Sequence, residues 1–133
     1  MPATSARKAL VINTDSSLRT AIKHQLSQSH FGTIVEASNG LEAIHILGEQ
    51  TVDLVVTDIA IGQVDAWRLT RLIRSNMLAS PAQTKVIVVS STYSERIAEA
   101  TAKEFEINRF IPMSQISLLG EIAEDLLQSN NDV

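Results

Sequence analysis

The alternation of short apolar runs with segments of helical periodicity most constrains the fold of this chain. Five short runs carry apolar strand-forming residues, and "KVIVVSS" is the clearest strand because it holds four consecutive β-branched residues. The predicted strands cover 8–13, 32–37, 52–57, 85–91 and 108–112. The other segments space their apolar residues along one helix face, over 16–28, 40–49, 65–76, 94–105 and 116–127.

Five strand–helix units of this kind predict an α/β fold with a doubly wound, five-stranded parallel sheet. Apolar strands that are joined by helical crossovers must be covered on both faces. In such sheets the functional site lies beyond the carboxyl ends of the strands, near the point where the strand order reverses. The polar or unusual residues at these ends are Asn13, Thr14, Asp15, Asp58, Ser90, Ser91, Pro112 and Met113.

Length and composition predict one globular domain. The chain has 133 residues, of which 44% are hydrophobic, and we place the domain at 8–128 between tails at 1–7 and 129–133. No apolar run approaches the ~18 residues of a membrane span, and the start lacks the apolar core of a signal peptide. The absence of cysteine fits a reducing compartment, so we expect a cytoplasmic protein. The net charge of −4 argues against nucleic acid as the main partner.

Asp58 is the side chain that most needs an explanation. It follows the apolar run "DLVVT", at the carboxyl end of a predicted buried strand. An ionised carboxylate that is taken out of water costs free energy unless a partner satisfies it. At this edge the carboxylate would lie near the two serine hydroxyls that begin at Ser90 and near the polar loop that begins at Asn13. Such a combination indicates a site that handles a phosphoryl group or a metal. The alternative is a turn aspartate without any chemistry.

Three stretches resemble response-regulator receiver domains of two-component signalling. "EASNGLEAIHIL" is similar to the family's second strand and helix, and "DLVVTDIAIGQVDAW" to its third strand, which ends in aspartate before a loop and an acidic helix start. "KVIVVSS" resembles its fourth strand, which ends in Thr or Ser. The resemblance covers about residues 8–128. It implies the flavodoxin-like receiver fold with strand order 2-1-3-4-5 and five helices, and a signalling protein rather than an enzyme.

The resemblance also implies roles for single residues. Asp58 stands at the phosphoacceptor position, and Ser90 at the position of the hydroxyl that contacts the phosphoryl oxygen. Phe110 stands where the family has an aromatic switch residue, and Ala60 where a backbone carbonyl binds Mg²⁺. The alternatives stay open: Ser90 as a strand-end hydroxyl bonded to backbone, and Phe110 as a half-buried strand residue.

The chain departs from the family at the residues that handle charge. Asn13 and Thr14 stand where the family has two acids, Met113 where it has a lysine, and Ile61-Gly62 where it has Met-Pro. Mg²⁺ prefers carboxylate oxygen and water, so a site made of Asp58, Ala60, Asn13 and Thr14 is expected to be weak or lost. Phosphoryl transfer depends on positioning and charge neutralisation, so it should be severely slowed.

Ordinary structural roles compete for several of these residues. Asn13 and Thr14 can lead into a helix that Asp15 or Ser16 caps, and Met113 and Trp67 can be packing residues. The three histidines lack metal-ligand spacing. A solvated helix face is the expected role of Arg68, Arg71 and Arg74.

We therefore expect a stand-alone, atypical receiver domain in a phosphorelay, which acts through protein contacts. Its expected partners are a sensor histidine kinase or phosphotransfer protein and a downstream target. The alternative is a pseudo-receiver interaction module that is never phosphorylated. The expected contact face is built from the fourth helix, fifth strand and fifth helix, and homodimerisation would use the same face. Leu118 is expected to be one partly exposed apolar residue there.

Overall fold

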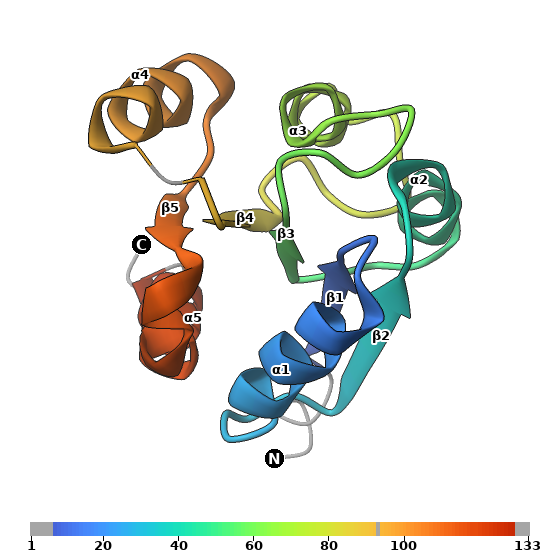
Figure 1. Cartoon of the computed structure of the whole chain (residues 1–133). Helices are drawn as coiled ribbons and strands as arrows, with labels where there is room; N and C mark the ends of the chain where they lie inside the picture. The colour runs from blue at the N-terminus through green and yellow to red at the C-terminus, as the bar shows by residue number, and fades with distance from the viewer. Residues whose placement is uncertain (1–6, 93, 130–133) are drawn as a thin grey trace.

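The computed structural model describes residues 7–92 and 94–129, which form a five-stranded sheet with helices on both faces (Figure 1). The strands are β1 (Lys8–Ile12), β2 (Thr33–Ala37), β3 (Leu54–Thr57), β4 (Lys85–Ser90) and β5 (Arg109–Pro112). The helices are α1 (Ser16–Leu26), α2 (Gly40–Glu49), α3 (Ala66–Arg74), α4 (Glu95–Phe105) and α5 (Leu119–Ser129). A 3₁₀ segment, η2 (Met113–Leu118), precedes α5.

The sheet is parallel throughout and has the order β2-β1-β3-β4-β5. This confirms the predicted fold class and strand order. The chain leaves β1 toward one edge and returns to the other side of β1 with β3, so the order reverses between these two strands. Thr57 at the end of β3 lies opposite Ile12 of β1 and Val88 of β4. The residues that follow these strands are thereby brought to one edge of the sheet.

Alternate strand residues enter two separate cores. Leu10, Ile12 and Val55 belong to the core that α2, α3 and α4 cover, together with Leu47 and Leu69. Figure 1 shows α1 and α5 on the opposite face, and their buried residues pack there against the remaining strand residues. That second core contains Ala9, Val11, Leu54, Val56, Ile87, Val89 and Ile111 from the strands and Ile22, Leu26, Leu119, Ile122 and Ala123 from the helices. Burial on both faces explains why the strand runs are continuously apolar.

Three helices begin at side chains that accept backbone N–H groups. Asp15 Oδ1 accepts from the second and third residues of its helix at 2.8 and 3.2 Å, so Asp15 and not Ser16 caps α1. Asn39 accepts from the Glu42 N–H at 2.8 Å to cap α2, and Asp65 caps α3 with a bond of 2.9 Å. Such caps satisfy N–H groups that have no partner inside the helix.

The last helix begins later than its apolar pattern predicts. The residues from Met113 form η2, in which Gln115 has non-helical backbone angles, and α5 begins only at Leu119. Leu118, the last residue of η2, is 44% exposed, which confirms the expected exposed apolar residue. The predicted tails fall almost wholly outside the described residues. At their borders, Arg7 is half-buried and forms an ion pair of 3.1 Å with Glu124.

The predicted solvated arginine face of α3 is wrong for Arg74. Its guanidinium is partly buried and donates hydrogen bonds to the carbonyls of Ala82 (2.8 Å), Thr84 (2.5 Å) and Glu106 (2.7 and 3.2 Å) and to Asn108 Oδ1 (3.0 Å). Burial lowers the pKa of this guanidinium. Arg74 therefore ties the end of α3 to the segments that lead into β4 and β5.

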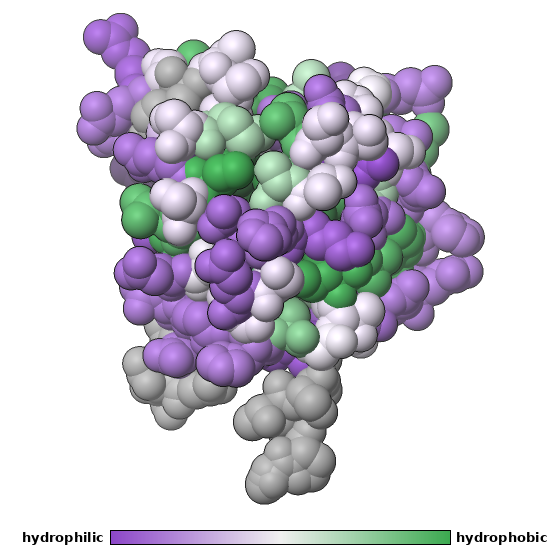
Figure 2. Space-filling model, turned by 60° about the horizontal axis from the view of Figure 1, so that its bottom comes forward, coloured by the Kyte–Doolittle hydropathy of each residue, from purple (hydrophilic) through white to green (hydrophobic). Residues whose placement is uncertain are grey.

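The surface seen from below Figure 1 is mostly hydrophilic, and hydrophobic residues gather in a band in its right half (Figure 2). The large apolar residues that remain exposed among the described ones are Leu41, Met77, Ile97 and Leu118. No helix within the described ranges is long and apolar enough to cross a membrane.

Candidate functional site

The carboxyl ends of β1, β3, β4 and β5 bring the predicted site residues together. We name this edge the acceptor pole and define it by Asn13, Asp58, Ser90 and Met113. Asn13 and Asp58 each follow the last paired residues of β1 and β3, and the Asp58 N–H donates to the Ile12 carbonyl at 3.2 Å. Ser90 lies opposite Pro112, the residue before Met113. The four residues thus stand at the ends of four neighbouring strands.

Asp58 is half-buried at the centre of this pole. Its Oδ1 accepts the N–H of Ile59 at 2.7 Å, and its carbonyl accepts the hydroxyl of Thr57 at 2.9 Å. No lysine or arginine among the described residues forms an ion pair with its carboxylate. Among the described residues its carboxylate is therefore held by the Ile59 N–H and not by a paired lysine or arginine. Its role as a phosphoacceptor stays a prediction.

The amide oxygen of Asn13 is engaged in a local hydrogen bond, and its amide nitrogen is buried. The residue is 1% exposed, and its Oδ1 accepts the N–H of Asp15 at 2.8 Å. This bond fixes the orientation of the amide, because the backbone N–H needs an acceptor. Its Nδ2 is left buried without a partner among the described residues. A buried donor of this kind suits an oxygen acceptor and does not suit a metal cation.

The remaining candidate ligands do not complete a magnesium site. Thr14 is exposed, and the carboxylate of Asp15 is engaged at the start of α1. Ala60 is exposed and forms an isolated bridge with Asp65. Among the described residues no group of three acidic, histidine or cysteine side chains could hold a metal ion. Since Mg²⁺ demands near-octahedral oxygen ligands, the residues present do not fit it well.

Ser90 has a local hydrogen-bond partner. It is 1% exposed, and its Oγ accepts the N–H of Thr92 at 3.0 Å and lies 3.2 Å from the hydroxyl of Thr92. This is the strand-end role that the sequence left open as an alternative. The phosphoryl-contacting role of Ser90 stays a prediction.

Phe110 lies in the core next to Trp67. The two rings meet edge to face with centroids 6.5 Å apart, and Trp67 meets Phe105 in the same way at 6.4 Å. Phe110 is only 9% exposed. The packing role expected for Trp67 is confirmed. The role of Phe110 as a switch residue stays a prediction.

Met113 is a packing residue at the start of η2, as the sequence left open. It begins η2 and packs, half-buried, against the core that α1 and α5 cover. A thioether is a weak acceptor and carries no charge, so it cannot neutralise a phosphoryl oxygen. Met113 therefore adds an apolar group, not a cation, to the acceptor pole.

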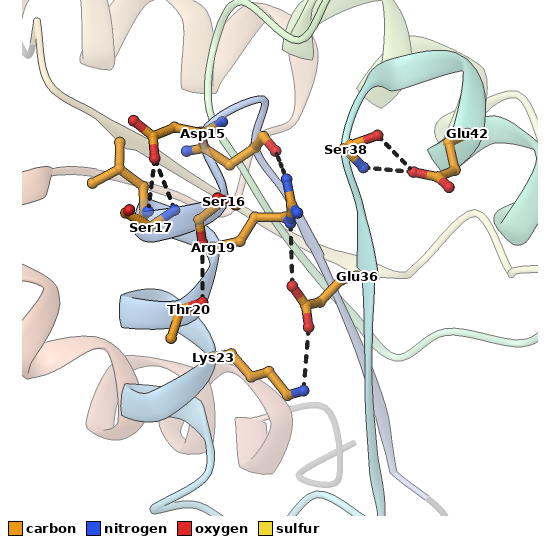
Figure 3. A network of polar contacts seen from close by, with 11 residues as sticks. Asp15, Ser16, Ser17, Arg19, Thr20, Lys23, Glu36, Ser38 and Glu42 are labelled. Carbon is orange, nitrogen blue, oxygen red and sulfur yellow. Dashed lines mark hydrogen bonds and ion pairs between the residues drawn. The ribbon is translucent and has the colours of Figure 1, made fainter.

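A network of charged side chains joins α1 to β2 next to the end of β1 (Figure 3). Arg19 donates to the Asn13 carbonyl at 2.8 Å and to Glu36 at 3.1 Å, and Lys23 donates to the same carboxylate at 3.2 Å. The hydrogen bonds from Lys23 and Arg19 lower the pKa of Glu36. We missed Arg19 in the sequence. The available signal was its position four residues after the capping Asp15, which turns it back toward the start of α1.

The loop after Asp58 is fixed by its contact with α2. The Gly40 N–H donates to the carbonyl of Ile61 at 2.6 Å, and Ile61 is fully buried. A Cβ at Gly40 would lie 2.8 Å from the Cβ of Val64, so only glycine fits here. Gly62 has a φ of 96°, which other residues rarely adopt. Ile61 and Gly62, which differ from the Met-Pro that the resemblance would lead one to expect, therefore form a loop with fixed packing and a fixed backbone conformation.

Replacing Asp58 with asparagine is expected to leave the domain as stable as before or more stable. A partly buried carboxylate without a cation has little to offset its desolvation. An asparagine keeps the oxygen that accepts the Ile59 N–H and removes the charge. Thermal unfolding near neutral pH measures this, with Asp58→Ala as the comparison that also loses the acceptor. A melting temperature several degrees lower for Asp58→Asn would contradict the expectation.

Magnesium is expected to bind weakly, because the acceptor pole lacks the acid pair. A Mg²⁺ titration followed by Trp67 fluorescence or calorimetry should not saturate in the low millimolar range. Asn13→Asp with Thr14→Asp should raise the affinity and, without metal, lower the stability, because like charges then crowd Asp58. Saturation of the unmodified chain at micromolar Mg²⁺ would refute this.

Comparison with known proteins shows the family. The model of the response regulator receiver domain matches residues 9–118, so this chain belongs to that family. It is 28% identical to the chemotaxis protein CheY of Listeria monocytogenes over 107 residues, which are 77% of this chain and 87% of that protein. It is 27% identical to CheY of Bacillus subtilis, over 79% of this chain and 88% of the relative.

The fold of solved receivers agrees with this assignment. The receiver domain of the Francisella response regulator 1452 superposes with a TM-score of 0.81 and 21% sequence identity. The match covers 93% of this chain and 98% of that structure. The chain is therefore a receiver domain of two-component response regulators, the class that works in phosphorelay signalling.

Proposed function

We propose that this receiver acts as an interaction module whose protein contacts form without phosphorylation of Asp58. The orientation of Asn13 supports this most directly, because its oxygen is taken by a backbone N–H and its buried NH₂ group faces no acceptor. A donor in place of an acid cannot help to bind the metal that phosphotransfer uses. The packed Met113 also supports the proposal, since it supplies no cation for the phosphoryl oxygens.

A working phosphoswitch is the second candidate, and a specific observation favours it. Asp58 is half-buried at the strand end and not enclosed in the core, and Ser90 and Phe110, for which the resemblance implies the hydroxyl and switch roles, lie in the paired strands β4 and β5. In that case a sensor histidine kinase or a phosphotransfer protein would supply the phosphoryl group. The loss of acids and lysine would then slow the reaction rather than abolish it.

The contact surface that we propose is the α4–β5–α5 face. Its outer side carries Glu95, Arg96, Glu99, Lys103 and Arg109, which are all exposed. Mixed charge of this kind sets partner choice through complementarity. Two exposed apolar residues belong to the neighbouring segments: Ile97 of α4 is 50% exposed and Leu118, the last residue of η2, is 44% exposed. We propose a cytoplasmic target protein or a second copy as its partner.

Charge reversal tests this function and its independence from Asp58. Arg96→Glu, Lys103→Glu and Arg109→Glu together should weaken dimerisation or partner pull-down by at least about tenfold, because complementary charges become repulsive. Asp58→Ala should leave the same binding unchanged, since no phosphorylation step populates the binding form. Circular dichroism and thermal unfolding confirm that both variants fold. Loss of binding in Asp58→Ala, with no effect of the reversals, would support the phosphoswitch instead.

A further inference from the structure

A groove between α3 and α4 lies outside the contact face of the proposed function. We name it the α3–α4 groove. It has a volume of about 440 Å³ and is lined by Ile59, Asp65, Trp67, Arg68, Arg71 and Phe105. α3 and α4 lie next to each other on the sheet face away from α1 and α5 (Figure 1). The groove is thus separate from the surfaces that α1 and α5 provide.

The groove combines aromatic walls with arginine at its rim. Trp67 and Phe105 are half-buried and meet edge to face. The Arg71 guanidinium lies 4.8 Å from the centroid of the Phe105 ring, within cation–π distance. Tryptophan, other aromatic residues and arginine are enriched in protein interfaces, and tryptophan and arginine dominate their energies. The composition of the groove is that of a contact site.

The two arginines at the rim form no ion pair with any described residue. Arg68 and Arg71 are exposed, and neither forms an ion pair with a carboxylate among residues 7–92 and 94–129. Asp65 lines the groove, but its Oδ1 is engaged by the Arg68 N–H as the helix cap. The whole chain carries a net charge of −4, so this cationic rim is a local exception. Its complement is an acidic partner surface.

We propose that the α3–α4 groove binds an acidic segment of a partner protein that places apolar side chains on Trp67 and Phe105. The volume lies in the range of ordinary binding clefts and admits one or two such side chains. The carboxylates of the segment would pair with Arg68 and Arg71. A second copy is the weaker candidate, because a contact with its acidic α5 would be head-to-tail and could not form a two-fold symmetric dimer.

The groove is also connected to the acceptor pole. Ile59, which forms one wall, donates its N–H to the carboxylate of Asp58 at 2.7 Å. Trp67 lines the groove and also packs against Phe110, the predicted switch residue, with the two ring centroids 6.5 Å apart. An occupant would therefore contact residues that adjoin Asp58 and Phe110. Binding to this groove needs no phosphorylation. The proposal therefore does not depend on whether the proposed function is correct.

A synthetic peptide tests the groove in the full chain. The probe is a capped eight-residue peptide of Asp and Glu with two leucines three positions apart. Trp67, the only tryptophan, should report saturable binding with a dissociation constant of about 1 mM or tighter, weakened by salt. Nitrogen–proton NMR shifts should map to α3 and the end of α4. Absence of saturation, or shifts that map elsewhere, would overturn the proposal.

Matched variants separate the groove from general charge attraction. Arg68→Gln with Arg71→Gln should weaken peptide binding at least about tenfold. Arg96→Gln with Lys103→Gln removes the same charge from the outer face of α4 and should change it less than about threefold. If the double variant has a lower melting temperature than the unmodified chain, Arg68→Gln alone replaces it in the binding experiment. Equal losses in both double variants would overturn the proposal, as would self-association that Arg68→Gln and Arg71→Gln abolish.

Discussion

Arg74→Ala is expected to lower the free energy of unfolding by about 3 kcal/mol, which corresponds to a melting temperature roughly 10 °C lower. The guanidinium donates five hydrogen bonds to four residues that precede β4 and β5. Its removal leaves carbonyl groups of Ala82, Thr84 and Glu106 without this donor and opens space under the loops. Urea unfolding followed by circular dichroism measures the loss.

Two further variants make this prediction specific. Arg68→Ala removes an exposed arginine from the same helix and should change the stability by less than about 0.5 kcal/mol. Arg74→Lys keeps the charge but not the planar set of donors, so it should recover only a small part of the loss. Equal effects of Arg68→Ala and Arg74→Ala would show that the Arg74 contacts contribute little.

Restoring the family's charged residues is expected to produce fast phosphorylation. Asn13→Asp, Thr14→Asp and Met113→Lys together should raise the rate of labelling by a small phosphodonor and Mg²⁺ at least about a hundredfold. The ion and the ammonium group each neutralise charge that develops on the phosphoryl oxygens, and each factor of ten corresponds to about 1.4 kcal/mol. Quench-flow or timed mass spectrometry measures the rate.

Asp58→Asn in this restored background is the necessary control, because it removes the acceptor and should abolish the label. The partial variants divide the effect: the acid pair should restore metal dependence, and Met113→Lys alone should have little effect without bound metal. A restored variant that is no faster than the unmodified chain would show that something other than these three positions limits the reaction.

The sequence predicted most of the fold, because the fold depends on local patterns. The apolar periodicity of α2 predicted its bounds correctly, and "KVIVVS" became β4 as expected. Asp15 was one of two cap candidates for α1, and Asp65 was expected at the start of α3 from the resemblance; both cap their helices. The strand order came from the resemblance, since periodicity shows which residues are buried but not which strands are neighbours. The start of α5 was wrong because Met113–Leu118 keeps apolar spacing in a 3₁₀ segment.

The sequence predicted that the strand-end residues lie together, but it did not predict their hydrogen bonds. Asn13 and Asp58 lie at neighbouring strand ends as expected. The Asn13 side-chain oxygen accepts a hydrogen bond from a backbone N–H. This bond depends on the local path of the chain, which composition does not show. Arg19 and Arg74 were missed for a related reason: their partners lie in other segments, and a surface helix position predicts solvent unless those segments are placed.

The mass of the unmodified chain after incubation with Mg²⁺ and a small phosphodonor tests the central claim most directly. We predict that the intact mass does not change and that the nitrogen–proton NMR spectrum keeps its positions around Asp58 and Phe110, because the acceptor pole lacks its acid pair and lysine. The restored triple variant, labelled in parallel, shows that the reagents work. A single phosphoryl adduct on the unmodified chain, lost in Asp58→Asn, would contradict the account and identify a working phosphoswitch.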